Sequence, residues 1–231
     1  LILNNLLKIN LYIYMSTQMK ILIQLFVLFL FLNFSALAEK ITVFEFTKEE
    51  LTTLKEKKVK GKTKWKLGAN ENGNFIRAEA EGTGSGLGKE LKINLNKTPY
   101  INITWKVEKG LEGINEKSKK GHDYAARVFV IKKTGATALS NRAVNYVFSS
   151  NNDIGKNWHS PYTKKSIDYV LSTTRINNNE WVTVKTNVKE NFKTLHNLNV
   201  DEINGVAIMT DTDNSKLKAV SYYQNIYFSS E

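Results

Sequence analysis

The chain has 231 residues, a formal net charge of +11 and 11% aromatic residues, which is enough material for a sizeable hydrophobic core. It contains no cysteine, which excludes disulfides, thiolate metal sites and a lipid-modified cysteine anchor. The positive charge favours anionic partners such as acidic polysaccharide, lipid head groups or nucleic acid, but a lysine-rich composition that serves solubility explains it equally well.

Residues 1–38 have the organisation of a leader. After Met19 come Lys20, an apolar run at 21–32 and the small-residue site Ala36-Leu37-Ala38, an order typical of a secretory signal peptide. The apolar run is short for a membrane span, so an uncleaved anchor is the weaker alternative. Residues 1–18 read as translated upstream sequence. We therefore expect one mature domain at 39–231, exported to the periplasm or secreted from a bacterium.

Removal of the leader takes away Lys8 and Lys20, which are two of the 33 basic residues, and none of the 22 acidic ones. The expected mature domain therefore carries a formal charge of +9.

The mature segment starts with strand and helix signals. Residues 41–46 alternate as a strand, and Thr47 with Glu50 has the spacing of a capping box. A short helix is predicted from there to about Lys58, with the basic run 55–64 as its solvated end and a loop.

Beyond this helix the chain is strand-like. The glycine-rich segment 82–88 lacks the Gly-Lys-Ser/Thr sequence of a phosphate-binding loop, so it is interpreted as a turn. The connection 151–165 contains several aromatic residues and is typical of a binding loop, and 191–199 is a loop or helical turn. Strands are predicted at 75–80, 91–95, 101–107, 121–131, 142–149, 167–173, 181–188, 206–209 and 219–228.

Many short strands joined by turns predict an all-β protein. The expected architecture is a jelly-roll-like β-sandwich with one short N-terminal helix. The closing strand at 219–228 resembles that of carbohydrate-binding jelly rolls and galactose-binding modules.

The strand at 121–131 has two unlike faces. Because a buried charge is costly unless it is paired, the second face should meet a cleft or a polar network. The apolar face, suited to a core, comprises Tyr124, Ala126, Val128 and Val130, and the other face comprises Asp123, Ala125, Arg127 and Phe129.

Arg127 needs partners for its planar group of donors. Asp123 is four residues away on the same face, about 13 Å at the rise of a strand, so it cannot pair directly. Asp211 and Asp213 follow the predicted strand at 206–209 and are the best candidates. A structural ion pair is favoured over contact between Arg127 and a ligand.

Several segments resemble a secreted bacterial family described as a domain of unknown function, number 3047. They are GHDYAARV at 121–128, NYVF at 145–148, WHSP at 158–161 and AIMTDTDN at 207–214, and the closing strand also fits. His122 stands where the family pattern is expected to have a second acid, which weakens any role that needs two adjacent carboxylates. The resemblance supports the fold and the compartment but implies no activity.

Metal and catalytic motifs are weak. Asp211, Asp213 and Asn214 offer oxygen ligands for calcium, but an Asx-rich turn accounts for them as well, and no other cofactor is indicated. The three histidines are too scattered for a metal triad, and no serine lies in a nucleophile elbow. Asp123, Asp153, Asp211 and Asp213 could supply a glycosidase pair, whose separation would decide its chemistry.

The favoured hypothesis is an exported, non-catalytic binding module for a glycan or another acidic envelope polymer. Trp158, Tyr162 and Trp181 could stack on sugar rings. The alternatives are a hydrolase or lyase that uses acids near Asp123 and Asp211, and a structural envelope protein. The expected partner is acidic or neutral polysaccharide, with a membrane surface as an alternative and nucleic acid not expected. The candidate ligand-binding residues are Asp123, Arg127, Asn145, Trp158, Tyr162, Asp211, Asp213 and Asn214.

Overall fold

The computed structural model describes residues 14–20, 22, 38–137 and 140–231. The chain divides into two compact units, Leu1–Ala38 and Glu39–Glu231, and every strand of the described residues lies in the second unit. Of the expected apolar run only Leu22, and of the expected cleavage site only Ala38, are among the described residues. Within the described ranges, no helix is long and apolar enough to cross a membrane.

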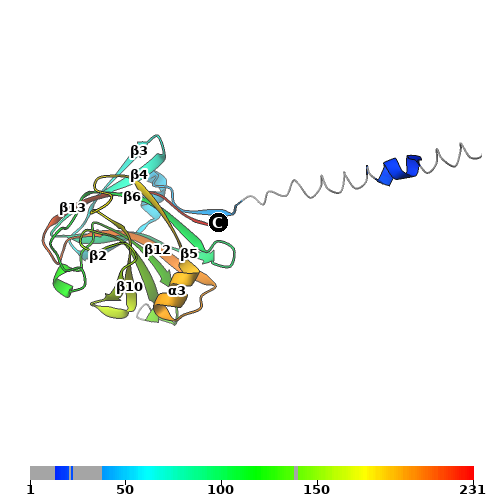
Figure 1. Cartoon of the computed structure of the whole chain (residues 1–231). Helices are drawn as coiled ribbons and strands as arrows, with labels where there is room; N and C mark the ends of the chain where they lie inside the picture. The colour runs from blue at the N-terminus through cyan, green and yellow to red at the C-terminus, as the bar shows by residue number, and fades with distance from the viewer. Residues whose placement is uncertain (1–13, 21, 23–37, 138–139) are drawn as a thin grey trace, which may run out of the picture. The chain divides into compact units, whose positions relative to one another are not determined.

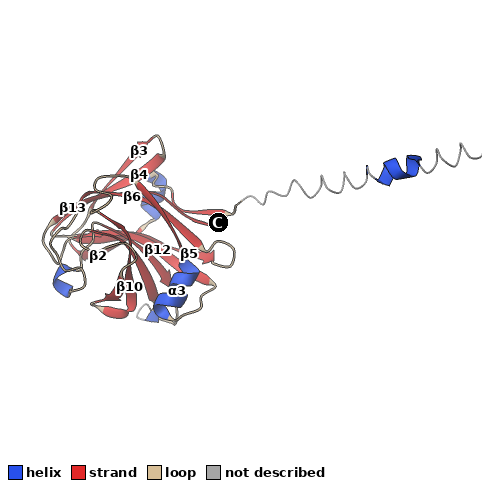
Figure 2. Ribbon diagram, viewed as in Figure 1, coloured by secondary structure: helices blue, strands red, loops and turns tan. Residues whose placement is uncertain are grey.

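Residues 39–231 form a β-sandwich of two sheets (Figures 1 and 2), which confirms the predicted fold class. Sheet A has the order β11-β6-β13-β4-β3, and β1 also pairs with β13. Sheet B has the order β2-β5-β12-β7-β8-β10-β9, in which β8 and β10 are parallel. The strands are β1 (Lys40–Phe44), β2 (Lys55–Lys60), β3 (Lys64–Asn70), β4 (Gly73–Glu81), β5 (Gly84–Asn94), β6 (Tyr100–Lys109), β7 (Ala126–Lys132), β8 (Arg142–Ser149), β9 (Asn157–Ser160), β10 (Thr163–Thr173), β11 (Val182–Asn187), β12 (Glu202–Asp211) and β13 (Lys218–Ser229).

The core lies between the two sheets and follows the alternation of the strands. In β6, Ile101, Ile103, Trp105 and Val107 are fully buried, as their period-two pattern predicts. Each such side chain stabilises the fold by about 1.5–3 kcal/mol relative to its exposed state. The indole of Trp105 also donates to Ser172 of sheet B, which satisfies its one buried polar atom.

The short helix is α2 (Lys48–Thr53), and its cap is partly as predicted. The hydroxyl of Thr47 accepts from the amide of Glu50, but the Glu50 carboxylate binds the amides of Glu45 and Phe46 instead of closing the box. The prediction of a helix to Lys58 and a basic loop was wrong. Those lysines form β2, an exposed edge strand on β5, where charge discourages further strand pairing.

The glycine-rich segment was also predicted wrongly. Only Gly82 takes a left-handed turn conformation, with φ of +60°, and the chain from Gly84 onward is β5. Gly86 and Gly88 lie in the middle of that strand. A β-carbon at Gly88 would lie 2.8 Å from the β-carbon of Ala207, and one at Gly86 would lie 2.9 Å from the carbonyl oxygen of Ile208. The glycines therefore let two strands approach and leave the face of the sheet hollow.

Other elements differ from the sequence prediction in smaller ways. The strands β3 and β9 were not predicted, and α3 (Val188–His196) replaces the expected loop or helical turn. The predicted strand at 121–131 begins only at Ala126, after a 3-10 turn at Lys119–Gly121. Tyr124 therefore does not face the sandwich core and packs with Val147 and Val170 in a separate cluster, while Ala125 does join the core.

Candidate binding cleft

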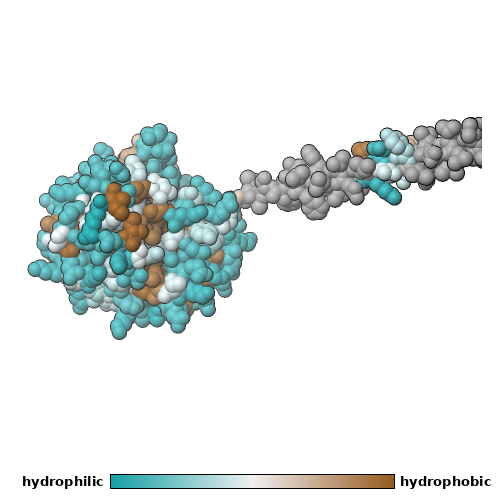
Figure 3. All heavy atoms as spheres, viewed as in Figure 1, coloured by the Kyte–Doolittle hydropathy of each residue, from teal (hydrophilic) through white to brown (hydrophobic). Residues whose placement is uncertain are grey.

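A cleft of about 900 Å³ lies on the face of sheet B that points away from the core. Its floor comes from β5, β12 and β7, where small and apolar side chains face outward. Two rows of paired residues cross it, one with Lys57, Gly86, Met209 and Arg127 and the other with Lys55, Gly88, Ala207 and Phe129. Figure 3 shows hydrophobic side chains gathered in the middle of the visible face of the domain, with hydrophilic ones around them.

Lysines stand along the rim of the cleft. Lys55 and Lys133 both pair with Glu90, at 3.2 and 2.7 Å, and Lys89 pairs with Glu50 at 2.7 Å. Lys57 has no ion-pair partner among the described residues. Positive charge therefore exceeds negative charge along this side.

The other end of the cleft holds the predicted Arg127–Asp211 ion pair. Asp211 ends β12 beside the start of β7, and both of its oxygens accept from Nη2 of Arg127, at 2.6 and 2.5 Å. The guanidinium lies 4.6 Å from the ring centre of Tyr124 and 5.2 Å from that of Phe129. The pair is confirmed, and one nitrogen of the guanidinium makes both contacts.

Burial is the largest single influence on the pKa of each member of this pair. It raises the pKa of Asp211 to about 6, and Arg127 offsets only part of that rise. Burial lowers the pKa of Arg127, but the combined attraction of Asp211, Asp168 and Tyr124 outweighs it, so the pKa of the guanidinium is raised and Arg127 stays charged. Asp211 is thus a carboxyl group in a cleft with an unusually high pKa, a feature of many functional sites.

Asp123 is fully buried and organises the loop after β12. Its carboxylate accepts from the side-chain amide of Asn214 at 2.8 Å and from the backbone amides of Asn214 and Ser215 at 3.2 and 2.5 Å. Asn214 in turn accepts from the hydroxyl of Tyr162 at 2.7 Å. These bonds hold Asn214 and the exposed Tyr162 at the end of the cleft.

Asp213 does not pair with Arg127, contrary to the prediction, because Asp211 accepts from that guanidinium instead. The Oδ1 atom of Asp213 is buried without a hydrogen-bond partner. One oxygen each of Asp123, Asp211 and Asp213 lie within 4.8 Å of one another, an arrangement suited to a hard cation such as calcium. Arg127 pairs with Asp211 and three N–H groups donate to Asp123, whereas Oδ1 of Asp213 has neither kind of partner among the described residues.

A second buried network lies beside this end and was missed from the sequence. Asp168 of β10 accepts from Nδ2 of Asn145 and contacts Nε2 of His122, both at 2.7 Å. Burial opposes ionisation of Asp168, but the bonds from His122 and Asn145 and the charge of Arg127 outweigh it and lower its pKa. An acid inside the apolar run Ile167-Asp168-Tyr169-Val170 was the available signal.

The candidate residues thus separate into two groups. Asn145 is 1% exposed and belongs to the buried network, and Trp158 is half-buried against Tyr124, Val147 and Val170. Neither these two nor the buried Asp123 line the cleft, whereas His122, which was not a candidate, does. The candidates that line it are Arg127, Tyr162, Asp211, Asp213 and Asn214.

The sequence resemblance is confirmed over residues 49–227, which match the family described as protein of unknown function DUF3047. The chain belongs to this family. Among curated proteins, none matches the chain in sequence.

Several solved structures are similar in fold. A family 11 carbohydrate-binding module from Clostridium thermocellum, in complex with a β-1,3-1,4-mixed-linked tetrasaccharide, has 12% identity and a TM-score of 0.45, over 84% of this chain and 96% of that one. A family 30 carbohydrate-binding module has 10% identity and a TM-score of 0.47, over 84% and 99%. A cellulase variant derived from Cel12A of Rhodothermus marinus has 7% identity and a TM-score of 0.44, over 76% and 100%. Likeness at this level carries no argument about function, which has to come from the cleft itself.

Proposed function

We propose that residues 39–231 form an exported binding module that holds a glycan in the cleft of sheet B. The observation that carries the proposal is the cleft of about 900 Å³, floored by Gly86, Gly88 and Ala207. This volume is in the range of ordinary ligand sites, and the combination of an apolar floor with a few polar groups is their usual construction.

The chemistry of the lining favours a sugar chain over an acyl chain. Phe129 and Met209 offer an apolar surface to the C–H face of a sugar ring. At the polar end, Tyr162, Asp213 and Asn214 offer donors and acceptors that match hydroxyl groups and have no counterpart on an acyl chain. The lysines of the rim favour a glycan that also carries carboxylates.

Binding to a panel of neutral and uronate-containing oligosaccharides, measured by calorimetry, tests the proposal. Ala207→Trp would fill the floor between Gly88 and Phe129, and Ala69→Trp at an exposed position near the end of β3 is the matched control. We expect the cleft substitution to weaken binding at least about tenfold, or 1.4 kcal/mol, and the control to leave it unchanged. Equal affinity of both variants for every bound sugar would overturn the proposal.

A carbohydrate-active enzyme is the second candidate. The pKa of Asp211, raised to about 6, lies in the range of a general acid, and Asp123 and Asp211 contribute oxygens to one cluster. Both carboxylates are however engaged by protein donors, which favours binding without turnover. New reducing ends or unsaturated products that Asp211→Asn abolishes in a folded protein would establish the enzyme instead.

A further inference from the structure

The outer face of sheet A, on the side of the sandwich opposite the cleft, carries a cluster of aromatic rings. Phe75 of β4, Trp181 immediately before β11 and Tyr222 of β13 contact one another, with ring centres 5.6–5.8 Å apart. All three are partly exposed, although they come from distant parts of the sequence. The pairing of β4, β13, β6 and β11 brings them together on one surface.

Three lysines lie over tyrosine rings on the same face. Lys40 is 4.1 Å from the ring centre of Tyr227, Lys106 is 4.7 Å from that of Tyr222, and Lys185 is 5.1 Å from that of Tyr100. Such contacts place cations at defined positions on an aromatic surface. In the described part of the chain none of these lysines has an ion-pair partner.

The acids of this face are already engaged. Glu79 pairs with Arg77 at 2.8 Å and with Lys218 at 2.9 Å, and Glu108 accepts from the hydroxyl of Tyr222. Bonds from Lys218 and Arg77 lower the pKa of Glu79 to about 2, so it stays ionised and paired. The hydroxyl of Tyr222 does not neutralise Glu108, but three lysines without ion-pair partners outnumber this one acid, so the balance of these charges is positive.

The polar side chains in the middle of the face are hydrogen-bonded within the protein. Thr104 and Thr183 are hydrogen-bonded at 2.8 Å, and Gln224 donates to Asn70 and to the carbonyl of Gly73. Gly68 leaves space for the ring of Phe75, because a β-carbon at this position would lie only 2.4 Å from a ring carbon of Phe75. The result is a shallow platform of rings with cations among them.

We propose that this platform, made of Tyr100, Phe75, Trp181, Tyr222, Tyr227 and their three lysines, is a second binding surface, for an acidic polysaccharide. Sugar rings would lie on Phe75 and Trp181, and uronate carboxylates would meet Lys40, Lys106 and Lys185, which lie over the tyrosine rings. The surface acts independently of the cleft, which lies on the other sheet.

Single-stranded nucleic acid also uses aromatic rings and cations, but the geometry here favours the polysaccharide. Bases need open ring faces in succession. Lysines cover the faces of Tyr100, Tyr222 and Tyr227, and the rings of Phe75, Trp181 and Tyr222 are tilted by 58–66° to one another. No run of parallel, uncovered rings is therefore offered by this cluster.

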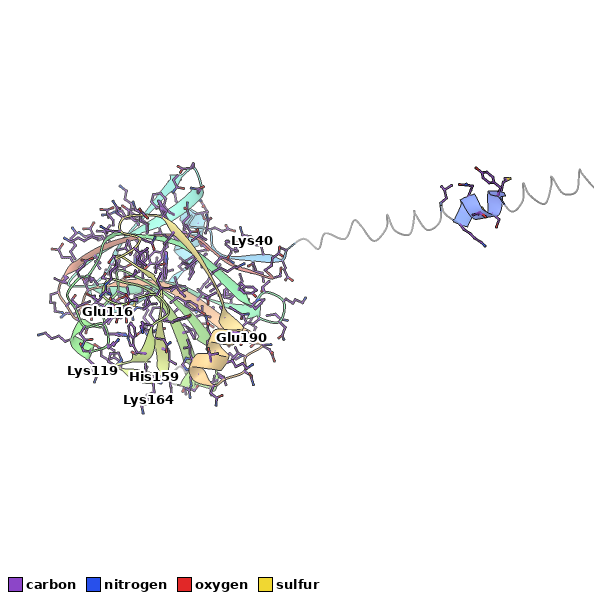
Figure 4. All side chains as sticks on the ribbon, in the orientation of Figure 1. Lys40, Glu116, Lys119, His159, Lys164 and Glu190 are labelled. Atoms are coloured by element: carbon purple, nitrogen blue, oxygen red, sulfur yellow. The ribbon has the colours of Figure 1, made fainter. Side chains whose placement is uncertain are left out.

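The test uses oligogalacturonate and a protein whose cleft is closed by Ala207→Trp, so that failure of the cleft proposal does not affect the result. In that background, Lys40→Gln, Lys106→Gln and Lys185→Gln are combined. The control combines Lys156→Gln, Lys164→Gln and Lys193→Gln, which removes the same charge from exposed positions elsewhere. Figure 4 shows Lys40 and Lys164 well apart on the domain.

We expect the platform variant to bind oligogalacturonate at least about tenfold more weakly and the control variant to lose less than about twofold. Trp181→Leu should also weaken binding, because it removes a ring without changing charge. Equal losses in the two lysine variants would show unspecific attraction and overturn the proposal, as would retained binding in the platform variant. Tighter binding of oligothymidylate than of oligogalacturonate would assign the platform to nucleic acid instead.

Discussion

The outer faces of the two sheets are built from the same alternation but have opposite shapes. On sheet B the outward positions of β5 and β12 include Gly86, Gly88 and Ala207, and the face is hollow. On sheet A the outward positions include Phe75 and Tyr222, and the face is a platform of rings. The period of the pattern decides which side chains face outward, whereas their size decides whether the surface becomes a cleft or a platform.

The two faces also differ in whether their charged side chains are buried and paired. Arg127 and Asp211 are buried at the end of the cleft and compensate each other, while Lys106 and Lys185 of the platform have no ion-pair partner among described residues. Buried charges are costly to uncouple and exposed ones are not. Substitutions should therefore change stability at the cleft and mainly change binding at the platform.

The largest expected effect is at Arg127. Arg127→Ala should destabilise the fold by about 3–5 kcal/mol, because it leaves Asp211 buried without its cation. Arg127→Met should cost less, because a long side chain still packs against Tyr124 and Phe129. Arg127→Lys should recover little, because an ammonium group lacks the planar surface that lies over these rings.

Urea unfolding of the three variants measures these differences. Lys133→Ala, which removes the exposed ion pair with Glu90, is the control and should cost less than about 1 kcal/mol. If Arg127→Ala lowers the free energy of unfolding by less than about 1 kcal/mol, the guanidinium of Arg127 is exposed to solvent and is available to an anionic ligand.

The second effect is a pH dependence that comes from Asp211. Because burial raises its pKa to about 6 from an ordinary value of 3.8, the folded state binds this proton more tightly than the unfolded state. The stability that results is complete below about pH 4 and is lost as the pH rises to about 6, on the order of 1–3 kcal/mol in all. Asp211→Asn should remove this slope from urea unfolding at pH 4–7.

The exposed Asp153→Asn is the control and should keep the slope. A slope of opposite sign in the native protein, with stability rising between pH 4 and 6, would mean that Arg127 holds the pKa of Asp211 below its ordinary value.

The third effect compares a glycine on each sheet. Gly88→Ala places a β-carbon 2.8 Å from Ala207 and 3.2 Å from the carbonyl oxygen of Val206, neither of which can swing away, and should cost about 1–3 kcal/mol. Gly68→Ala meets only the ring of Phe75, which can turn aside, and should cost less than about 1 kcal/mol. Thermal unfolding ranks the two, and near-ultraviolet circular dichroism should change only for Gly68→Ala. The reverse order would mean that the platform, and not the floor of the cleft, is the more tightly packed face.

The smallest expected effect is that of calcium. Because Asp211 and Asp123 already accept from Arg127 and from amides, we expect millimolar calcium to raise the melting temperature by less than about 1 °C. A rise of several degrees that Asp213→Asn abolishes would establish a metal site at the three acids.

The parts of this fold that the sequence predicted are those where alternation is strict. The core face of β6 and the extent of β8 follow directly from period-two patterns. The lysine-rich β2 was not predicted, because an exposed edge strand shows no alternation of apolar and polar residues. The strand at 91–95 was predicted, but the first half of β5 was not, because glycine is ordinarily a turn residue and its use in a strand depends on the approach of β12.

The site was predictable where chemistry demands a partner. A guanidinium on an apolar strand requires an acid, and this requirement led from Arg127 to Asp211. It did not separate Asp211 from Asp213, because both follow the predicted strand at 206–209. In the structure Asp211 is the last residue of β12 and Asp213 lies in the turn after it. Asp168 and His122 are brought into contact by the parallel pairing of β8 and β10 and by the path of the loop before β7. The residues next to them in the sequence indicate neither the pairing nor the path.

The pairing of β1 with β13 has a mechanical consequence. Lys40 lies opposite Ser229, and Glu39 and Ser230 are hydrogen-bonded, so both ends of the domain leave from one end of a single antiparallel pair (Figure 1). A pulling force applied between Glu39 and Glu231 would load these hydrogen bonds one after another instead of together. β1 would unzip from the sandwich at low force, while the strands that carry the cleft on sheet B would remain unstretched.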